Sequence, residues 1–65
     1  MTYKIWFQDG SKVQTRGGVD NEIDTDAELH EMASRFDFDA TEVLAHGETE
    51  MLDNGAVIGG VYKLT

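Results

Sequence analysis

The N-terminal residues alternate apolar and polar side chains, as expected for a β-strand that is buried on one face. The apolar residues that share one face of this run are Tyr3, Ile5 and Phe7. The run ends at Asp9-Gly10, a strong signal for a two-residue hairpin loop. The pattern therefore predicts a first strand over residues 2–8 and a second strand over residues 11–16.

This predicted hairpin carries large apolar groups on both faces. With a two-residue loop, Trp6 would face Val13 across the two strands, on the side opposite to Tyr3. One face is expected to pack on a helix. The other face is expected to be a contact surface for a partner or the seam of a homodimer.

A helix is predicted over residues 26–36. Thr25, followed three residues later by Glu28, forms a capping box, in which each side chain accepts a hydrogen bond from a free backbone N–H of the helix start. The apolar residues recur at the spacing of one helix face and are Leu29, Met32, Ala33 and Phe36. The opposite face is polar and is expected to face water.

Residues 37–47 carry two conflicting patterns. Asp39, three residues before another acidic side chain, could cap a short second helix that ends at Gly47. Alternating residues from position 43 to position 51 are instead typical of a strand. We favour a strand over residues 43–52, because it would supply a partner for the apolar run that follows.

The last part of the chain predicts a second hairpin. Asp53-Asn54-Gly55 is another turn signal, and residues 56–64 are rich in valine, isoleucine and tyrosine. Gly59-Gly60 inside this run indicates a β-bulge or a close approach of another backbone. The expected fold is one small α+β domain over residues 1–65, in the order ββαββ, with a four-stranded antiparallel sheet of two hairpins packed on one helix.

The chain is strongly acidic, with a formal net charge of −8, and this charge is concentrated in its centre. Between Asp20 and Asp53 there are 12 acidic residues and a single basic residue, Arg35. Such a segment repels nucleic acid and anionic membranes and attracts a basic protein surface. We therefore expect a protein partner, and neither direct nucleic-acid binding nor membrane binding.

Composition also limits the chemistry. Cysteine is absent, which excludes disulfides and thiolate metal sites. Proline is absent as well. No apolar run approaches the roughly 20 residues of a membrane span, and no secretory signal is recognisable, so we expect a protein that acts in a cytoplasm. The spacing of His30 and His46 does not bring them together with carboxylates, so no catalytic, metal or cofactor residues are predicted and enzyme activity is not expected.

Acidic residues occupy alternate positions in the segment that leads into the predicted helix. In an extended chain, alternate side chains point the same way, about 6.6 Å apart, and would form a ladder of carboxylates that resembles the regular negative charge of DNA. The same residues fall on ligand positions of a calcium-binding loop, but Thr25 stands where that loop needs glycine. Calcium binding is therefore not expected, and a solvated loop remains the simpler alternative to the ladder.

We predict that the acidic side chains form the surface that binds the partner. The residues assigned to this surface are Asp20, Glu22, Asp24, Asp26, Glu28, Glu31, Asp37, Asp39, Glu42, Glu48 and Glu50. The composition of the chain resembles that of the small phage-borne inhibitors of restriction enzymes, CRISPR complexes or uracil-DNA glycosylase. No sequence motif is shared with them. The resemblance implies an inhibitor that mimics DNA, occupies the basic surface of a nucleic-acid-binding protein and acts in the host cytoplasm.

Two other functions remain open. The acidity could serve solubility or adaptation to a salty cytoplasm in a structural or regulatory module that forms a homodimer. The chain could also be an acidic antitoxin that neutralises a basic toxin. The neighbouring genes would distinguish these alternatives from the inhibitor.

Overall fold

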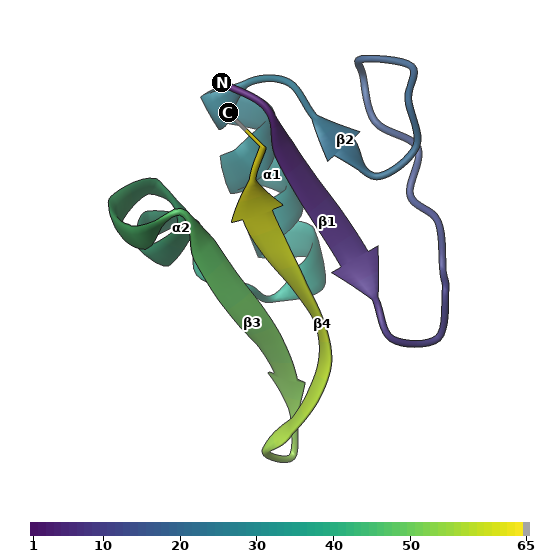
Figure 1. The fold of residues 1–65 in the computed structure, drawn as a ribbon, viewed down its shortest axis with the longest axis vertical. Helices are drawn as coiled ribbons and strands as arrows, with labels where there is room; N and C mark the ends of the chain where they lie inside the picture. The colour runs from purple at the N-terminus through teal and green to yellow at the C-terminus, as the bar shows by residue number, and fades with distance from the viewer. Residues whose placement is uncertain (65) are drawn as a thin grey trace.

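A computed structural model of the chain describes residues 1–64. Its strands form one antiparallel sheet in the order β2-β1-β4-β3. The strands are β1 (Tyr3–Phe7), β2 (Glu22–Ile23), β3 (Glu48–Asp53) and β4 (Ala56–Lys63). The helices are α1 (Asp26–Phe36), which lies behind β1 and β4 in Figure 1, and α2 (Ala40–His46), which lies beside the start of β3. The α+β class and the four-stranded antiparallel sheet are confirmed, but two helices pack against the sheet instead of one.

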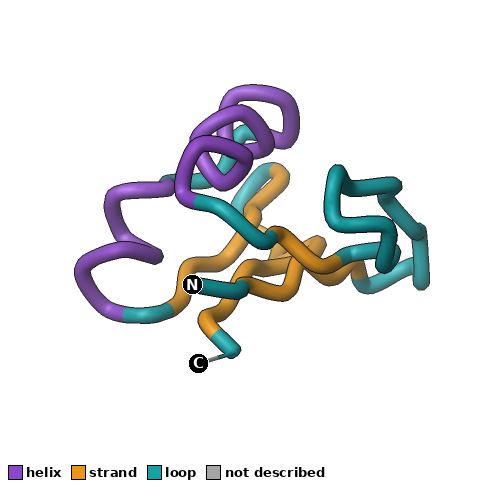
Figure 2. Tube along the Cα trace, turned by 90° about the horizontal axis from the view of Figure 1, so that it is seen from above, coloured by secondary structure: helices purple, strands orange, loops and turns teal. Residues whose placement is uncertain are grey.

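The core lies between the helices and one face of the sheet (Figure 2). Its largest fully buried side chains are Tyr3, Ile5, Ile23, Leu29, Val43, Met51 and Val61. The predicted helix stripe packs here, with Leu29 and Met32 buried and with Ala33 and Phe36 partly buried. The alternation in β1 is also confirmed, because Tyr3 and Ile5 enter the core while Trp6 points to the opposite, uncovered face of the sheet.

The predicted second strand over residues 11–16 is wrong. One side of β1 pairs with β4, and the other side pairs with the short strand β2. Asn21 occupies the place next to β1, because its carbonyl accepts a hydrogen bond from the Ile5 N–H at 2.9 Å and its side-chain amide donates to the Ile5 carbonyl at 2.9 Å. Val13 is buried in the core instead of facing Trp6.

The favoured strand over residues 43–52 is wrong in its first part and confirmed in its second. The segment before Gly47 forms α2, which begins after Asp39, where the Asp39 carboxylate accepts a hydrogen bond from the Glu42 N–H at 3.2 Å. The helix ends at Gly47 with a φ of 87°, a left-handed conformation that glycine adopts at little cost. Caps at both ends therefore outweigh the alternating pattern, and β3 follows directly.

The second hairpin is confirmed. Asn54 and Gly55 have φ values of 50° and 83°, as the type I′ turn of a two-residue hairpin requires. The pairing of β3 with β4 shifts between Met51 and Leu52, which leaves Ile58 as the additional residue of β4. The predicted bulge is thus present next to the glycine pair.

Gly59 and Gly60 allow β1 to approach β4 closely. A Cβ atom on Gly59 would collide with the carbonyl oxygen of Trp6, and one on Gly60 would lie 2.8 Å from the Trp6 indole nitrogen. The indole therefore lies directly against the backbone of β4. The predicted close approach of another backbone is confirmed.

Candidate functional site

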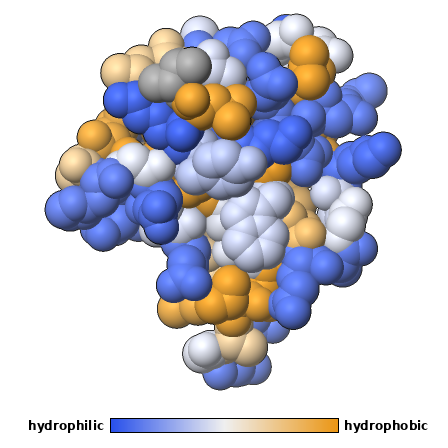
Figure 3. Space-filling view, viewed as in Figure 1, coloured by the Kyte–Doolittle hydropathy of each residue, from blue (hydrophilic) through white to orange (hydrophobic). Residues whose placement is uncertain are grey.

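The sheet face opposite the helices carries exposed aromatic side chains. Trp6 on β1 and Tyr62 on β4 are 38% and 40% exposed. They share this face because the register pairs Trp6 with Gly60 and Lys4 with Tyr62. Figure 3 shows the face, with pale and orange side chains in its middle and hydrophilic ones around them.

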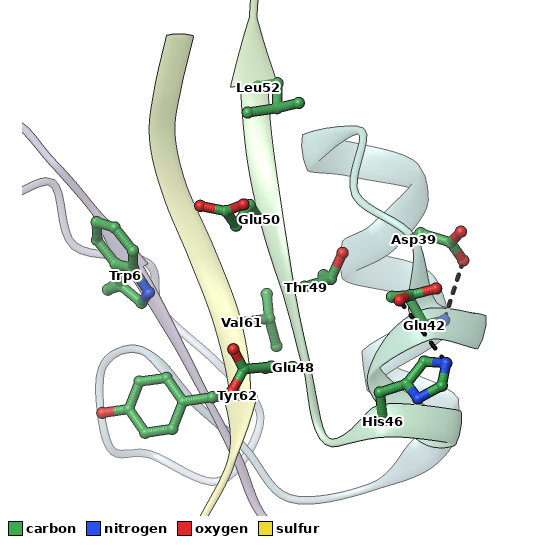
Figure 4. A pocket seen from close by; sticks show the side chains of 10 residues that line it. All are labelled: Trp6, Asp39, Glu42, His46, Glu48, Thr49, Glu50, Leu52, Val61 and Tyr62. Atoms are coloured by element: carbon green, nitrogen blue, oxygen red, sulfur yellow. Dashed lines mark hydrogen bonds and ion pairs between the residues drawn. The ribbon is translucent and has the colours of Figure 1, made fainter. Parts of the chain in front are cut away.

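An open groove of about 650 Å³ lies on this face and continues along β3 to α2 (Figure 4). The residues that line it are Trp6, Asp39, Glu42, His46, Glu48, Thr49, Glu50, Leu52, Val61 and Tyr62. We call it the acidic groove, because four of these side chains are carboxylates and one is a histidine. The aromatic rings come from the middle of the sheet, and the carboxylates come from α2 and from the edge strand β3.

The carboxylates of the acidic groove are held by regular structure. Glu48 and Glu50 alternate along β3 with Thr49 and Met51, which turn towards the core, so both carboxylates project on the open face. Asp39 is the N-cap of α2. Glu42 and His46 follow on the same helix face, with 3.9 Å between Oε1 and Nε2.

The alternating acids from Asp20 to Glu28 do not form a continuous ladder. Asn21 has a left-handed φ of 67°, which interrupts the extended chain, and the only strand in this segment is the two-residue strand Glu22–Ile23. The helix then begins at Asp26. Successive acidic side chains of this segment therefore do not share one face. Two carboxylates at alternate positions on one strand face occur instead in β3, at Glu48 and Glu50.

Glu28 does not belong to an exposed binding surface as predicted, because this residue is only 2% exposed. Its Oε2 accepts a hydrogen bond from the Arg16 N–H at 2.8 Å. Half of the predicted capping box is present, since Thr25 Oγ1 accepts from the Glu28 N–H at 3.1 Å. The carboxylate of Glu28 holds the loop before β2 instead of closing the box.

Three other predicted acids are exposed but have roles within the fold. Asp26 accepts a hydrogen bond from the Tyr3 hydroxyl at 2.6 Å. Glu31 pairs with the Arg16 guanidinium through both carboxylate oxygens, at 3.0 and 2.8 Å. Asp37 is the C-cap of α1, with a left-handed φ of 58°. These residues therefore stabilise the loop and the two ends of α1.

The structure brings four of the predicted residues together in the acidic groove and leaves the others outside it. Those inside are Asp39, Glu42, Glu48 and Glu50. Sequence reasoning missed Tyr62, Leu52 and His46 as their neighbours. The alternation in the last strand could have placed Tyr62 on a sheet face, but not next to Trp6, because that depends on the pairing of β4 with β1.

Neither a group of metal ligands nor a membrane-spanning helix is found in the described part of the chain. Among residues 1–64, no three His, Asp or Glu side chains are grouped so that they could hold a metal ion. Neither helix there is long and apolar enough to cross a bilayer.

No family model, curated protein or solved structure matches this chain. We therefore infer a function from the acidic groove and the open sheet face, since a fold does not define one.

Proposed function

We propose that the protein is a small acidic binding protein that occupies the basic nucleic-acid-binding surface of a partner protein, as an inhibitor that mimics DNA would. The observation that carries this proposal is the acidic groove, in which four carboxylates lie beside the exposed rings of Trp6 and Tyr62. The partner is expected to be a protein rich in lysine and arginine at the surface that contacts this groove.

Two kinds of contact support the proposal. Proteins hold nucleic-acid phosphates mainly with lysine and arginine, and these side chains pair equally well with carboxylates. Arginine also stacks on aromatic rings, and sites for single strands stack bases on flat side chains. The spaced carboxylates of Glu48 and Glu50 can stand for phosphates, and the rings of Trp6 and Tyr62 can stand for bases.

The charge of the whole molecule supports the same partner. A net charge of −8 attracts a basic surface over a distance of about a Debye length, which is roughly 10 Å at 0.1 M salt and about 3 Å at 1 M. Association is therefore expected to be fast at low salt and to slow steeply as salt is added.

The first test is a capture experiment that uses DNA as the competitor. The immobilised protein is incubated with a bacterial lysate at low salt, and the bound proteins are eluted with short duplex DNA or with buffer of the same ionic strength. A nucleic-acid-binding protein that is released by the DNA and not by the buffer supports the proposal. Release only by salt, with no effect of DNA, contradicts it.

The second test compares two double variants with the same change of charge. Glu48→Lys with Glu50→Lys reverses the acidic groove, whereas Asp9→Lys with Asp20→Lys reverses two exposed acids outside it. The groove variant should associate with the captured protein at least about tenfold more slowly and with a flatter salt dependence. The control should keep most of the rate. Equal losses in both variants would show that only net charge matters and would reject the groove as the site.

A further inference from the structure

The edge of β3 is the only long strand edge that stays open within residues 1–64. β3 ends the sheet order and is 6 residues long, and no backbone hydrogen bond reaches its outer side in this part of the chain. The opposite edge, β2, has 2 residues. It is also covered by the preceding loop, because the Glu22 N–H donates to the Val19 carbonyl at 3.2 Å.

The register of β3 with β4 shows which backbone groups of β3 point to the open edge. In an antiparallel ladder, residues alternate between those that bond to the neighbouring strand and those that point away from it. The Gly47 carbonyl accepts a hydrogen bond of 2.7 Å from β4, so Thr49 and Met51 also face β4 through their backbones. The N–H and C=O groups of Glu48 and Glu50 therefore point to the open edge.

The same residues thus present both a free backbone and a carboxylate. Their side chains lie on the open face beside Trp6 and Tyr62, and across the edge the groove is bordered by Asp39, the N-cap of α2 (Figure 4). A strand that adds to this edge would place its alternate side chains next to Glu48 and Glu50. Its own residues at these positions would have to be basic to match the charge.

We propose that the edge of β3 binds an extended segment of the partner, which adds to the sheet as a further strand and carries lysine or arginine at alternate positions. Backbone hydrogen bonds hold such a segment, and its alternate side chains provide the specificity. This inference rests on the proposed function and defines the form in which the basic surface is recognised. The two carboxylates on β3 select the basic side chains.

A second copy of this chain does not fit the same edge. Pairing β3 with β3 of another copy would bring the carboxylates of Glu48 and Glu50 against those of the partner copy, and like charges in directly opposite positions destabilise a strand pair. Each copy also carries a net charge of −8. Charge on an edge strand is a common protection against self-pairing, and here it leaves the edge open to a basic strand.

Two short peptides of identical composition test the proposal directly. In one, the alternating peptide, a single threonine separates two lysines, and in the other, two threonines separate the two lysines. Only the first can place one lysine beside Glu48 and the other beside Glu50 while it pairs as a strand, because side chains three positions apart point to opposite faces of a strand. It should bind about tenfold more tightly, the equivalent of a single good hydrogen bond. It should also slow hydrogen exchange at the amides of Glu48 and Glu50.

Two variants separate the backbone contribution from the charge. Glu50→Gln removes only the charge, whereas Glu50→Pro also removes the N–H that points to the open edge, a position where a strand tolerates proline. The glutamine variant should reduce the preference for the alternating peptide, because only Glu48 still selects a lysine. The proline variant should bind both peptides more weakly than the glutamine variant, because a backbone hydrogen bond is also lost. An alternating peptide methylated at the backbone nitrogens that would face β3 should also bind more weakly, and this measurement does not depend on the folding of a variant.

The outcomes separate this inference from the proposed function. Equal binding of the two peptides, or unchanged exchange at Glu48 and Glu50, would overturn strand addition and leave the DNA-competed capture to decide the proposed function. A failed capture together with preferential binding of the alternating peptide would overturn only the mimicry of DNA.

Discussion

Thr25 and Asp39 each satisfy a backbone N–H three residues further along the chain and so start the two helices. Thr25 Oγ1 accepts from Glu28 at 3.1 Å, and Asp39 Oδ1 accepts from Glu42 at 3.2 Å. Such contacts matter in a chain of 65 residues, because a small domain buries a small fraction of its surface and has little stability in reserve. Both caps could be read from local spacing.

The cap at Thr25 gives a prediction for stability. Thr25→Ala should lower the free energy of unfolding by about 1 kcal/mol, because the Glu28 N–H loses its partner at the helix start. Denaturant unfolding followed by circular dichroism measures this change. Thr41→Ala is the matched control, since Thr41 is an exposed residue of α2 and alanine favours helices. An unchanged midpoint for Thr25→Ala would mean that its hydroxyl does not stabilise the helix.

Tyr3 gives a prediction for the pH dependence of stability. The hydrogen bond to Asp26, then burial, then the negative charge of Asp26 raise the pKa of Tyr3. The pKa in the folded state then exceeds that in the unfolded state, which is about 10. The stabilisation is therefore complete below that pH and is lost as the pH rises through the folded pKa.

Tyr3→Phe removes this titration and leaves Tyr62 as an internal control. Denaturation midpoints measured across the alkaline range should fall more steeply for the natural chain than for the variant. Parallel curves would show that Tyr3 does not contribute to the alkaline loss of stability.

Among the structural elements, local signals predicted α1, β1 and the β3–β4 hairpin correctly, and long-range pairing decided the rest. The hydrogen bonds of Asn21 to Ile5 place β2, not residues 11–16, next to β1. No pattern near Asp9-Gly10 reveals this, because the competing strand lies beyond a loop with a single buried residue, Val13. The acidic groove was hidden for the same reason, since it needs β4 beside β1 to bring Trp6 near β3.

The placement of Trp6 gives a prediction at the level of the sheet. It is the only tryptophan, so tryptophan emission reports on the open face. Binding of the alternating peptide at the edge of β3 should shift the emission to shorter wavelength, because its side chains beside Glu50 displace water from the groove that Trp6 also lines. The shift should be smaller with the peptide whose lysines are three positions apart.

Dilution provides the control for self-association. At low salt the emission of the free protein should not depend on its concentration, because copies of the same acidic edge repel each other. A concentration-dependent shift together with a dimer in sedimentation would assign this face to a homodimer instead.

Over the whole molecule, charge is arranged unevenly across the sheet. Lys4 and Lys12 lie with Asp20 around a second hollow next to β1, whereas the acidic groove lies at the β3 side. The molecule therefore has an electric dipole as well as a net charge. An approaching basic surface is drawn towards β3 and away from the lysines, which orients the encounter before contact is made.

The two central strands of the sheet, β1 and β4, are the first and the last strands of the chain. Tyr3 pairs with Lys63, and the Leu64 N–H donates to the Thr2 carbonyl at 2.8 Å, so β1 and β4 lie side by side in Figure 1. Closing so long a loop is entropically costly and slows folding. The helices and the β3–β4 hairpin can form from neighbouring residues, but none of them has a complete core until β1 arrives. A single late docking step, that of β1 onto β4, is therefore expected to set the rate at which the molecule folds.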